Sequence, residues 1–133
     1  FMPVNDWTRT NLDLVMADGS KALYFNWFDL AVFDCYILKR AAAESSYTPF
    51  ILAEAERRFK NYSQSQLDEL AGIIMFGIPG EKKTTVEEMR DRLKPYEDID
   101  HDALKENLKY FLLEIAPVAA ECNLNLAIHP DDP

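Results

Sequence analysis

The side chains that could most clearly bind a metal ion or take part in a reaction lie at the carboxyl end of this 133-residue chain. His129, Asp131 and Asp132 follow a mostly apolar run, residues 124–128, that we expect to form a β-strand. An imidazole at a strand end can bind Mn, Fe or Zn, and a neighbouring carboxylate can orient it or bind hydroxyl groups of a ligand. Two plainer interpretations stay open: His129 is a structural histidine, and the aspartates cap the next helix or turn.

A second group of candidates lies near the amino end, in the polar loop that we expect at residues 5–11. The guanidinium of Arg9 can bind a carboxylate through two parallel hydrogen bonds, and Trp7 can form one wall of a binding site. Asp6 is a further candidate in the same loop. The alternative is an arginine on the surface and a tryptophan that plugs the end of the core. His101 follows a helix cap, and we expect it on the surface.

Composition and charge limit the classes of function. The formal net charge is −9, so the chain lacks the positive surface that nucleic acids and anionic membranes attract. No apolar run approaches the roughly 18 residues of a membrane span, and no secretory signal opens the sequence. Cys35 and Cys122 are not clustered, and we expect two reduced thiols in or near the core of a cytoplasmic protein. We expect Phe1 and Pro133 to be cut edges of a larger protein.

The first 61 residues predict extended structure and then two helices. Residues 1–4 have the pattern of a strand end, and residues 12–25 that of a hairpin with a type I′ turn at Asp18-Gly19. The first helix is expected from an Asn26 cap to Leu38, with basic residues 39–40 at the negative end of its dipole. The second covers residues 50–61 after Thr48-Pro49. Its charged residues predict a solvated face: Glu54, Glu56, Arg57, Arg58 and Lys60.

Three further helices are indicated downstream. Ser63 and Gln66 form a capping box for a helix that ends near Gly77, before a break at 78–80. The next helix ends near Lys94, and its cap has two candidates: Thr84 with Glu87, or Thr85 with Glu88.

The longest helix begins at an Asp100 cap and stops at Asn123, a residue type that tolerates the left-handed conformation. Pro117 should remove one hydrogen bond and bend it. The strand 124–128 follows almost at once. The three-four spacing of apolar residues predicts one buried stripe: Leu104, Leu108, Phe111, Leu112, Ile115, Val118, Ala119 and Cys122.

Only residues 1–4 and 124–128 have the pattern of core strands. A stable sheet usually needs three or more strands, and the long helix needs a sheet against which to bury its stripe. We therefore expect an α/β fold in which this chain supplies part of a larger sheet.

The chain resembles the mannonate dehydratase family over its whole length, including a helical segment at 26–95 that one branch of that family carries. The end motifs, Phe-Met-Pro-Val-Asn-Asp-Trp-Thr-Arg-Thr and Ala-Ile-His-Pro-Asp-Asp-Pro, are the most specific. The other matching segments are residues 18–23, 37–40, 96–100 and 106–112.

The resemblance implies a (β/α)8 TIM barrel similar to the xylose-isomerase superfamily. Residues 1–133 would be a single partial domain of that barrel, and residues 26–95 a helix-rich insertion between two barrel strands. The implied reaction removes water from D-mannonate to give 2-dehydro-3-deoxy-D-gluconate, in hexuronate catabolism, with Mn²⁺ or Fe²⁺ as cofactor. A metal acting as a Lewis acid would stabilise the enediolate charge that develops when the C2 proton is removed.

By the same resemblance His129 is a metal ligand, whereas Cys35 and Cys122 do not match the family's ligand cysteine. The remaining ligands and the main acid and base are expected beyond Pro133. We expect a homodimer for the full-length protein. The residues expected to bind the sugar acid are Asp6, Trp7, Arg9, Asp131 and Asp132.

Two other functions stay open. The helix-rich and acidic segment 26–116 is compatible with an interaction module that has no catalytic activity. The chain could also belong to another sugar-acid isomerase or epimerase of the same barrel superfamily.

Overall fold

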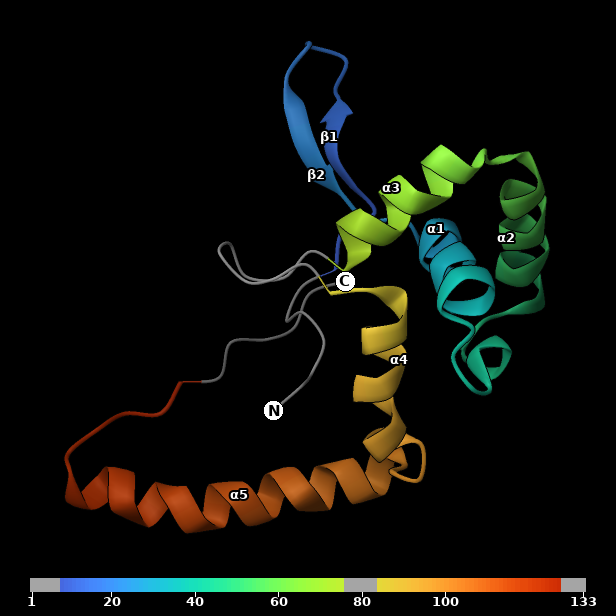
Figure 1. Cartoon of the computed structure of the whole chain (residues 1–133). Helices are drawn as coiled ribbons and strands as arrows, with labels where there is room; N and C mark the ends of the chain where they lie inside the picture. The colour runs from blue at the N-terminus through green and yellow to red at the C-terminus, as the bar shows by residue number, and fades with distance from the viewer. Residues whose placement is uncertain (1–7, 76–83, 128–133) are drawn as a thin grey trace. The chain divides into compact units, whose positions relative to one another are not determined.

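A computed structural model describes residues 8–75 and 84–127 of the chain (Figure 1). These residues form two compact units, of which the first ends at Leu93 and the second begins at Lys94. The strand end expected at residues 1–4 and the break expected at 78–80 lie outside the described residues. The first unit contains a hairpin and a group of helices, and the second contains one long helix.

The hairpin of the first unit is confirmed, but its turn differs from the prediction. Strands β1 (Asn11–Val15) and β2 (Lys21–Tyr24) pair antiparallel. The carbonyl of Met16 accepts from the Gly19 N–H at 3.0 Å, and the Met16 N–H donates to the Ser20 carbonyl at 2.8 Å. Gly19 has a φ of +83°, whereas Asp18 is not among the residues with positive φ. The type I′ prediction was therefore wrong: the loop includes residue 17 as well, and only its last residue is left-handed.

The first helix changes its winding halfway along. Asn26 caps α1 (Trp27–Val32) by accepting from the Phe28 and Asp29 N–H groups, as predicted. The chain then continues as a π-helix, η1 (Phe33–Leu38), which ends at Lys39 with a φ of +55°. The wider turn of a π-helix brings residues five apart to one side, and Phe33 and Leu38 are both buried.

The π-helix contains a buried carboxylate with a full set of partners. Asp34 is 7% exposed and accepts from Arg40 Nε at 2.9 Å, Arg40 Nη2 at 2.7 Å and the Tyr47 hydroxyl at 3.0 Å. Burial, and then the charge of Asp34, raise the pKa of Tyr47, so its hydroxyl stays protonated and donates. Arg40 thus forms an ion pair with one carboxylate, whereas the sequence predicts a general interaction of its charge with the negative end of the helix dipole.

The remaining helices of the first unit begin at the predicted caps. After η2 (Ala43–Ser46), Thr48 caps α2 (Pro49–Asn61), and Ser63 with Gln66 forms the capping box of α3 (Gln64–Ile74). The expected end of α3 at Gly77 lies outside the described residues. Between the two candidate caps for α4 (Val86–Leu93), the structure shows Thr85 and Glu88 bonded reciprocally, at 2.8 and 3.1 Å.

The helices of the first unit enclose one core. Helix α1 packs on α2, and both α3 and α4 pack on η1. The Arg90 side chain of α4 donates to the carbonyls of Ile37 and Leu38, which are left without helical partners where η1 ends. The buried apolar residues that form this core are Ala31, Val32, Phe33, Leu38, Ala55, Leu70, Ala71, Ile74 and Met89.

The predicted solvated face of α2 was wrong at Arg58. Its Nη1 donates to the Asp29 carboxylate of α1 at 2.8 Å, and its guanidinium lies 4.9 Å from the ring centroid of Phe28. The side chains of Arg58 and Asp29 are only 23% and 15% exposed. Arg57, the next residue, is 63% exposed and pairs with Glu54 within its own helix. Arg58 therefore joins two helices, which a charge pattern along one helix does not reveal.

The second unit is built on α5 (His101–Glu121), which follows the short η3 (Lys94–Tyr96). Asp100 caps α5 by accepting from the Ala103 N–H at 2.8 Å, and Pro117 lies inside the helix, both as predicted. Asn123 has the expected left-handed φ, +54°. The N–H groups of Asn123 and Leu124 donate back to the carbonyls of Ala120 and Ala119, which completes a Schellman motif.

The stripe of α5 is mostly exposed in the structure, which corrects the prediction of a buried one. Ala119 is buried and Leu112 and Ile115 are half-buried. Residues 124–127 form no strand, against the prediction for 124–128, because a strand needs a neighbour for its backbone groups and the described residues offer none there. The exposed stripe residues are Leu104, Leu108, Phe111, Val118 and Cys122.

The two glycines of the described residues make a matched pair for a stability test. Gly19→Ala should lower the free energy of unfolding by about 1 kcal/mol, because a Cβ disfavours its left-handed φ although no atom lies nearby. Gly72→Ala, in the interior of α3 and equally unobstructed, should raise it by about 0.5–1 kcal/mol. Urea unfolding of both variants checks the signs, and a shift in the same direction for both would contradict the assigned turn.

The ion pair between α1 and α2 predicts different effects for adjacent arginines. Arg58→Met should destabilise the protein by about 2 kcal/mol, since it leaves the half-buried Asp29 carboxylate without its charged donor. Arg57→Met, at the exposed neighbouring position, should leave the unfolding midpoint unchanged. Equal midpoints for the two variants in thermal unfolding would refute a role for Arg58 between the helices.

Candidate functional site

Five of the six residues predicted for the site lie outside the described residues. The predicted metal ligand is His129, and the predicted substrate-binding residues among the five are Asp6, Trp7, Asp131 and Asp132. Their roles stay predictions. Arg9 is described, and the structure shows what holds it.

Arg9 lies just before the hairpin and is half-buried. Its Nη1 donates to the Thr8 carbonyl at 2.8 Å. The next residue, Thr10, is only 6% exposed, and both its backbone N–H and its hydroxyl donate to the Tyr24 carbonyl, at 2.9 and 3.3 Å. The residue that follows Arg9 is therefore hydrogen-bonded to β2 through both its backbone and its side chain.

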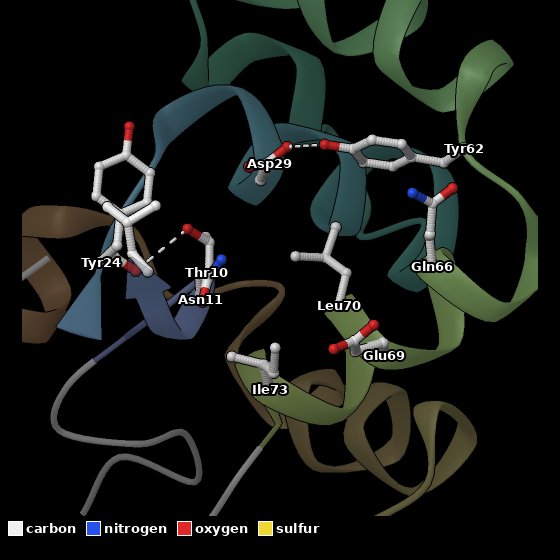
Figure 2. A pocket seen from close by; sticks show the side chains of 10 residues that line it. Thr10, Asn11, Tyr24, Asp29, Tyr62, Gln66, Glu69, Leu70 and Ile73 are labelled. Carbon is white, nitrogen blue, oxygen red and sulfur yellow. Dashed lines mark hydrogen bonds between the residues drawn. The ribbon is translucent and has the colours of Figure 1, made fainter. Parts of the chain in front are cut away.

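A hollow of about 260 Å³ opens beside Thr10 in the first unit (Figure 2). Three segments line it: the hairpin, the start of α1 and the region from Tyr62 into α3. Arg9 is not among the lining residues. No local pattern of residues predicts this hollow, because its walls come from segments that are distant along the chain. The lining residues are Thr10, Asn11, Leu14, Tyr24, Asp29, Tyr62, Gln66, Glu69, Leu70 and Ile73.

Several polar groups of the hollow already have hydrogen-bond partners in the protein. Asp29 accepts from the Tyr62 hydroxyl at 2.7 Å as well as from Arg58. Burial and this hydrogen bond raise the pKa of Tyr62, which keeps the phenol protonated as a donor. Gln66 accepts from the Ser63 N–H at 2.9 Å, whereas Glu69 lies at an exposed position. These groups can accept hydrogen bonds from the hydroxyls of a small polar ligand, but they include no activated nucleophile.

Neither the described cysteines nor the described histidine completes a catalytic or metal centre. Burial, and then the charges of Asp34 and Glu44, raise the pKa of the half-buried Cys35, which disfavours the reactive thiolate. Cys122 is exposed, so the expectation of a thiol in or near the core is wrong at that position. His101 is exposed as predicted, and its Nδ1 lies 3.7 Å from Oδ1 of Asp102. No three His, Cys, Asp or Glu residues among residues 8–75 and 84–127 are grouped to hold a metal ion.

No helix in the described part of the chain is long and apolar enough to cross a membrane.

Comparisons with known proteins place the chain in a family. A family model described as D-mannonate dehydratase (UxuA) matches residues 1–133. A Mannonate dehydratase of Marinomonas sp. (strain MWYL1) is 48% identical over 134 residues, which are 100% of this chain and 34% of that protein. A Mannonate dehydratase of Rhizobium meliloti (strain 1021) is 38% identical over 134 residues, 33% of its length. The chain thus spans about a third of these relatives, and its match to the family model over every residue shows that it belongs to the D-mannonate dehydratase (UxuA) family.

Proposed function

We propose that this chain forms about a third of a hydro-lyase that converts D-mannonate into 2-dehydro-3-deoxy-D-gluconate and water. The observation that supports this most directly is the family match over all 133 residues, together with the names of the two relatives. The same observation weakens the two alternatives, a non-catalytic acidic module and a different sugar-acid isomerase. Hexuronate catabolism in the cytoplasm, a TIM-barrel fold and a homodimer are parts of the proposal.

In this proposal Arg9 binds the substrate carboxylate. A guanidinium presents two N–H groups in a plane that matches the two carboxylate oxygens, and hydrogen bonds to charged groups are the stronger kind. The carboxylate is attached to C2, from which the reaction removes a proton. A fixed positive charge beside it stabilises the extra negative charge of the transition state. The proton acceptor and the donor to the leaving C3 hydroxyl are expected from the rest of the protein.

The proposed cofactor is Mn²⁺ or Fe²⁺, with His129 as one ligand. Residues 8–75 and 84–127 contain no cluster of three or more His, Cys, Asp or Glu side chains placed to hold a metal ion. A bound divalent metal would supply Lewis-acid chemistry at the substrate oxygens. The support for His129 is its residue type and its place in the end motif Ala-Ile-His-Pro-Asp-Asp-Pro.

The activity is tested with the full-length protein that contains this chain. With Mn²⁺ and D-mannonate it should form the keto-deoxy acid, whereas residues 1–133 alone should be inactive. Failure of the metal-loaded full-length protein to form that product would contradict the proposed function, and turnover by the 133-residue chain would contradict its standing as one part of the catalytic unit.

The role of Arg9 predicts a change in substrate binding. Arg9→Met in the full-length protein should raise KM for D-mannonate about 10- to 100-fold, which corresponds to the roughly 1.5–3 kcal/mol of a hydrogen bond to a charged group. Arg92→Met, at an exposed position of α4, serves as the matched control and should leave KM unchanged. An unaltered KM for Arg9→Met would exclude this arginine from the site.

The metal proposal has a readout that does not depend on activity. His129→Ala in the full-length protein should lower the affinity for Mn²⁺ at least about tenfold. Loss of a residue that only hydrogen-bonds to a metal ligand already lowers metal affinity by about that factor. The other histidine of the chain provides the control, since His101→Ala changes an exposed imidazole. Metal content after gel filtration measures both, and equal Mn²⁺ retention by both variants would remove His129 from the ligand set.

A further inference from the structure

Thr10 is one of two buried polar residues in the part of the chain that the structure describes, the other being Asp34. Asp34 is held by Arg40 and Tyr47. The Thr10 hydroxyl bonds instead to the Tyr24 carbonyl, which already accepts the Thr10 backbone N–H. The N–H already forms the hairpin hydrogen bond, and the hydroxyl uses the second lone pair of the same carbonyl. With the N–H bond alone, residue 10 could rotate about that bond. The hydrogen bond from the hydroxyl restricts this rotation.

Tyr24, which accepts both hydrogen bonds from Thr10, makes two further contacts. Its backbone pairs with Asn11 across the hairpin, and its hydroxyl accepts from Asn26 Nδ2 at 3.0 Å. Asn26 is the cap of α1, and α1 is joined to α2 through Asp29 and Arg58. This series of contacts connects residue 10 to the helical core of the first unit.

We propose that Thr10 is a positioning residue that fixes the backbone of Arg9 so that its guanidinium meets the substrate carboxylate with both N–H groups. The inference rests on the proposed function, in which Arg9 binds that carboxylate. A planar two-bond contact depends steeply on position, because a misplacement of about 1 Å can reduce the rate roughly a hundredfold. Residue 9 is directly bonded to residue 10, so rotation at Thr10 moves the guanidinium.

The test compares Thr10→Val, which keeps the shape without the hydroxyl, with Thr10→Ser, which keeps the hydroxyl. In the full-length protein with saturating Mn²⁺, Thr10→Val should raise KM for D-mannonate and lower kcat, so that kcat/KM falls about tenfold, less than the roughly hundredfold of a full 1 Å misplacement. Thr10→Ser should retain the wild-type KM. If Thr10→Val does not fold, Thr10→Ala takes its place in the same comparison.

A purely structural hydroxyl provides the control. Thr48 caps α2 through the Ile51 N–H, so Thr48→Val should lower the melting temperature and leave KM unchanged. The double variant Arg9→Met/Thr10→Val should have the KM of Arg9→Met alone, because Thr10 acts only through Arg9.

The outcomes separate the two proposals. A raised KM for Arg9→Met with a wild-type KM for Thr10→Val would overturn the positioning role and leave Arg9 in the site. Additive effects in the double variant would overturn it as well. No effect of Arg9→Met would exclude Arg9 from the site and overturn the role of Thr10, whereas no turnover by the wild-type protein would overturn the proposed function itself.

Discussion

The arrangement of the first unit depends on the neutralisation of one carboxylate. Asp29 lies in the first turn of α1, where the dipole favours a negative charge, but its side chain is only 15% exposed where α1 packs on α2. A carboxylate in that position is costly unless it is paired and hydrogen-bonded. Arg58 from α2 and the Tyr62 hydroxyl meet that requirement, and the same two contacts fix one wall of the hollow beside the hairpin.

Features that depend on a few adjacent residues could be predicted from the sequence. Caps at Asn26, Thr48, Ser63 and Asp100 were confirmed because a cap is a hydrogen bond between residues two or three apart. The hairpin was predicted for the same reason, yet its turn type was not. The Asp18 carboxylate accepts from the Ser20 N–H and hydroxyl, and this local arrangement leaves only Gly19 left-handed.

Features that depend on distant residues could not be predicted in the same way. A period of apolar residues gives the extent of the first helix, but it does not distinguish α from π winding at Phe33–Leu38, where Arg90 from α4 binds the last carbonyls. The apolar stripe of α5 is another example. Its three-four spacing predicts the helix correctly, but the stripe can be buried only where another element packs against it. The hollow was missed because it joins three segments.

The candidate site combines both kinds of feature, and this explains why motifs reveal its residues more readily than its geometry. Arg9 was proposed from its residue type, since a guanidinium suits a carboxylate wherever it stands. The placement that we propose for it depends on Thr10, Tyr24 and Asn26, whose contacts link the loop to the hairpin and the hairpin to α1. The buried Thr10 hydroxyl could not be recognised from the sequence, because its acceptor is a backbone carbonyl 14 residues away. A loop residue gains a defined direction only through such contacts, so in the proposed function the helices around Asp29 influence how Arg9 meets its ligand.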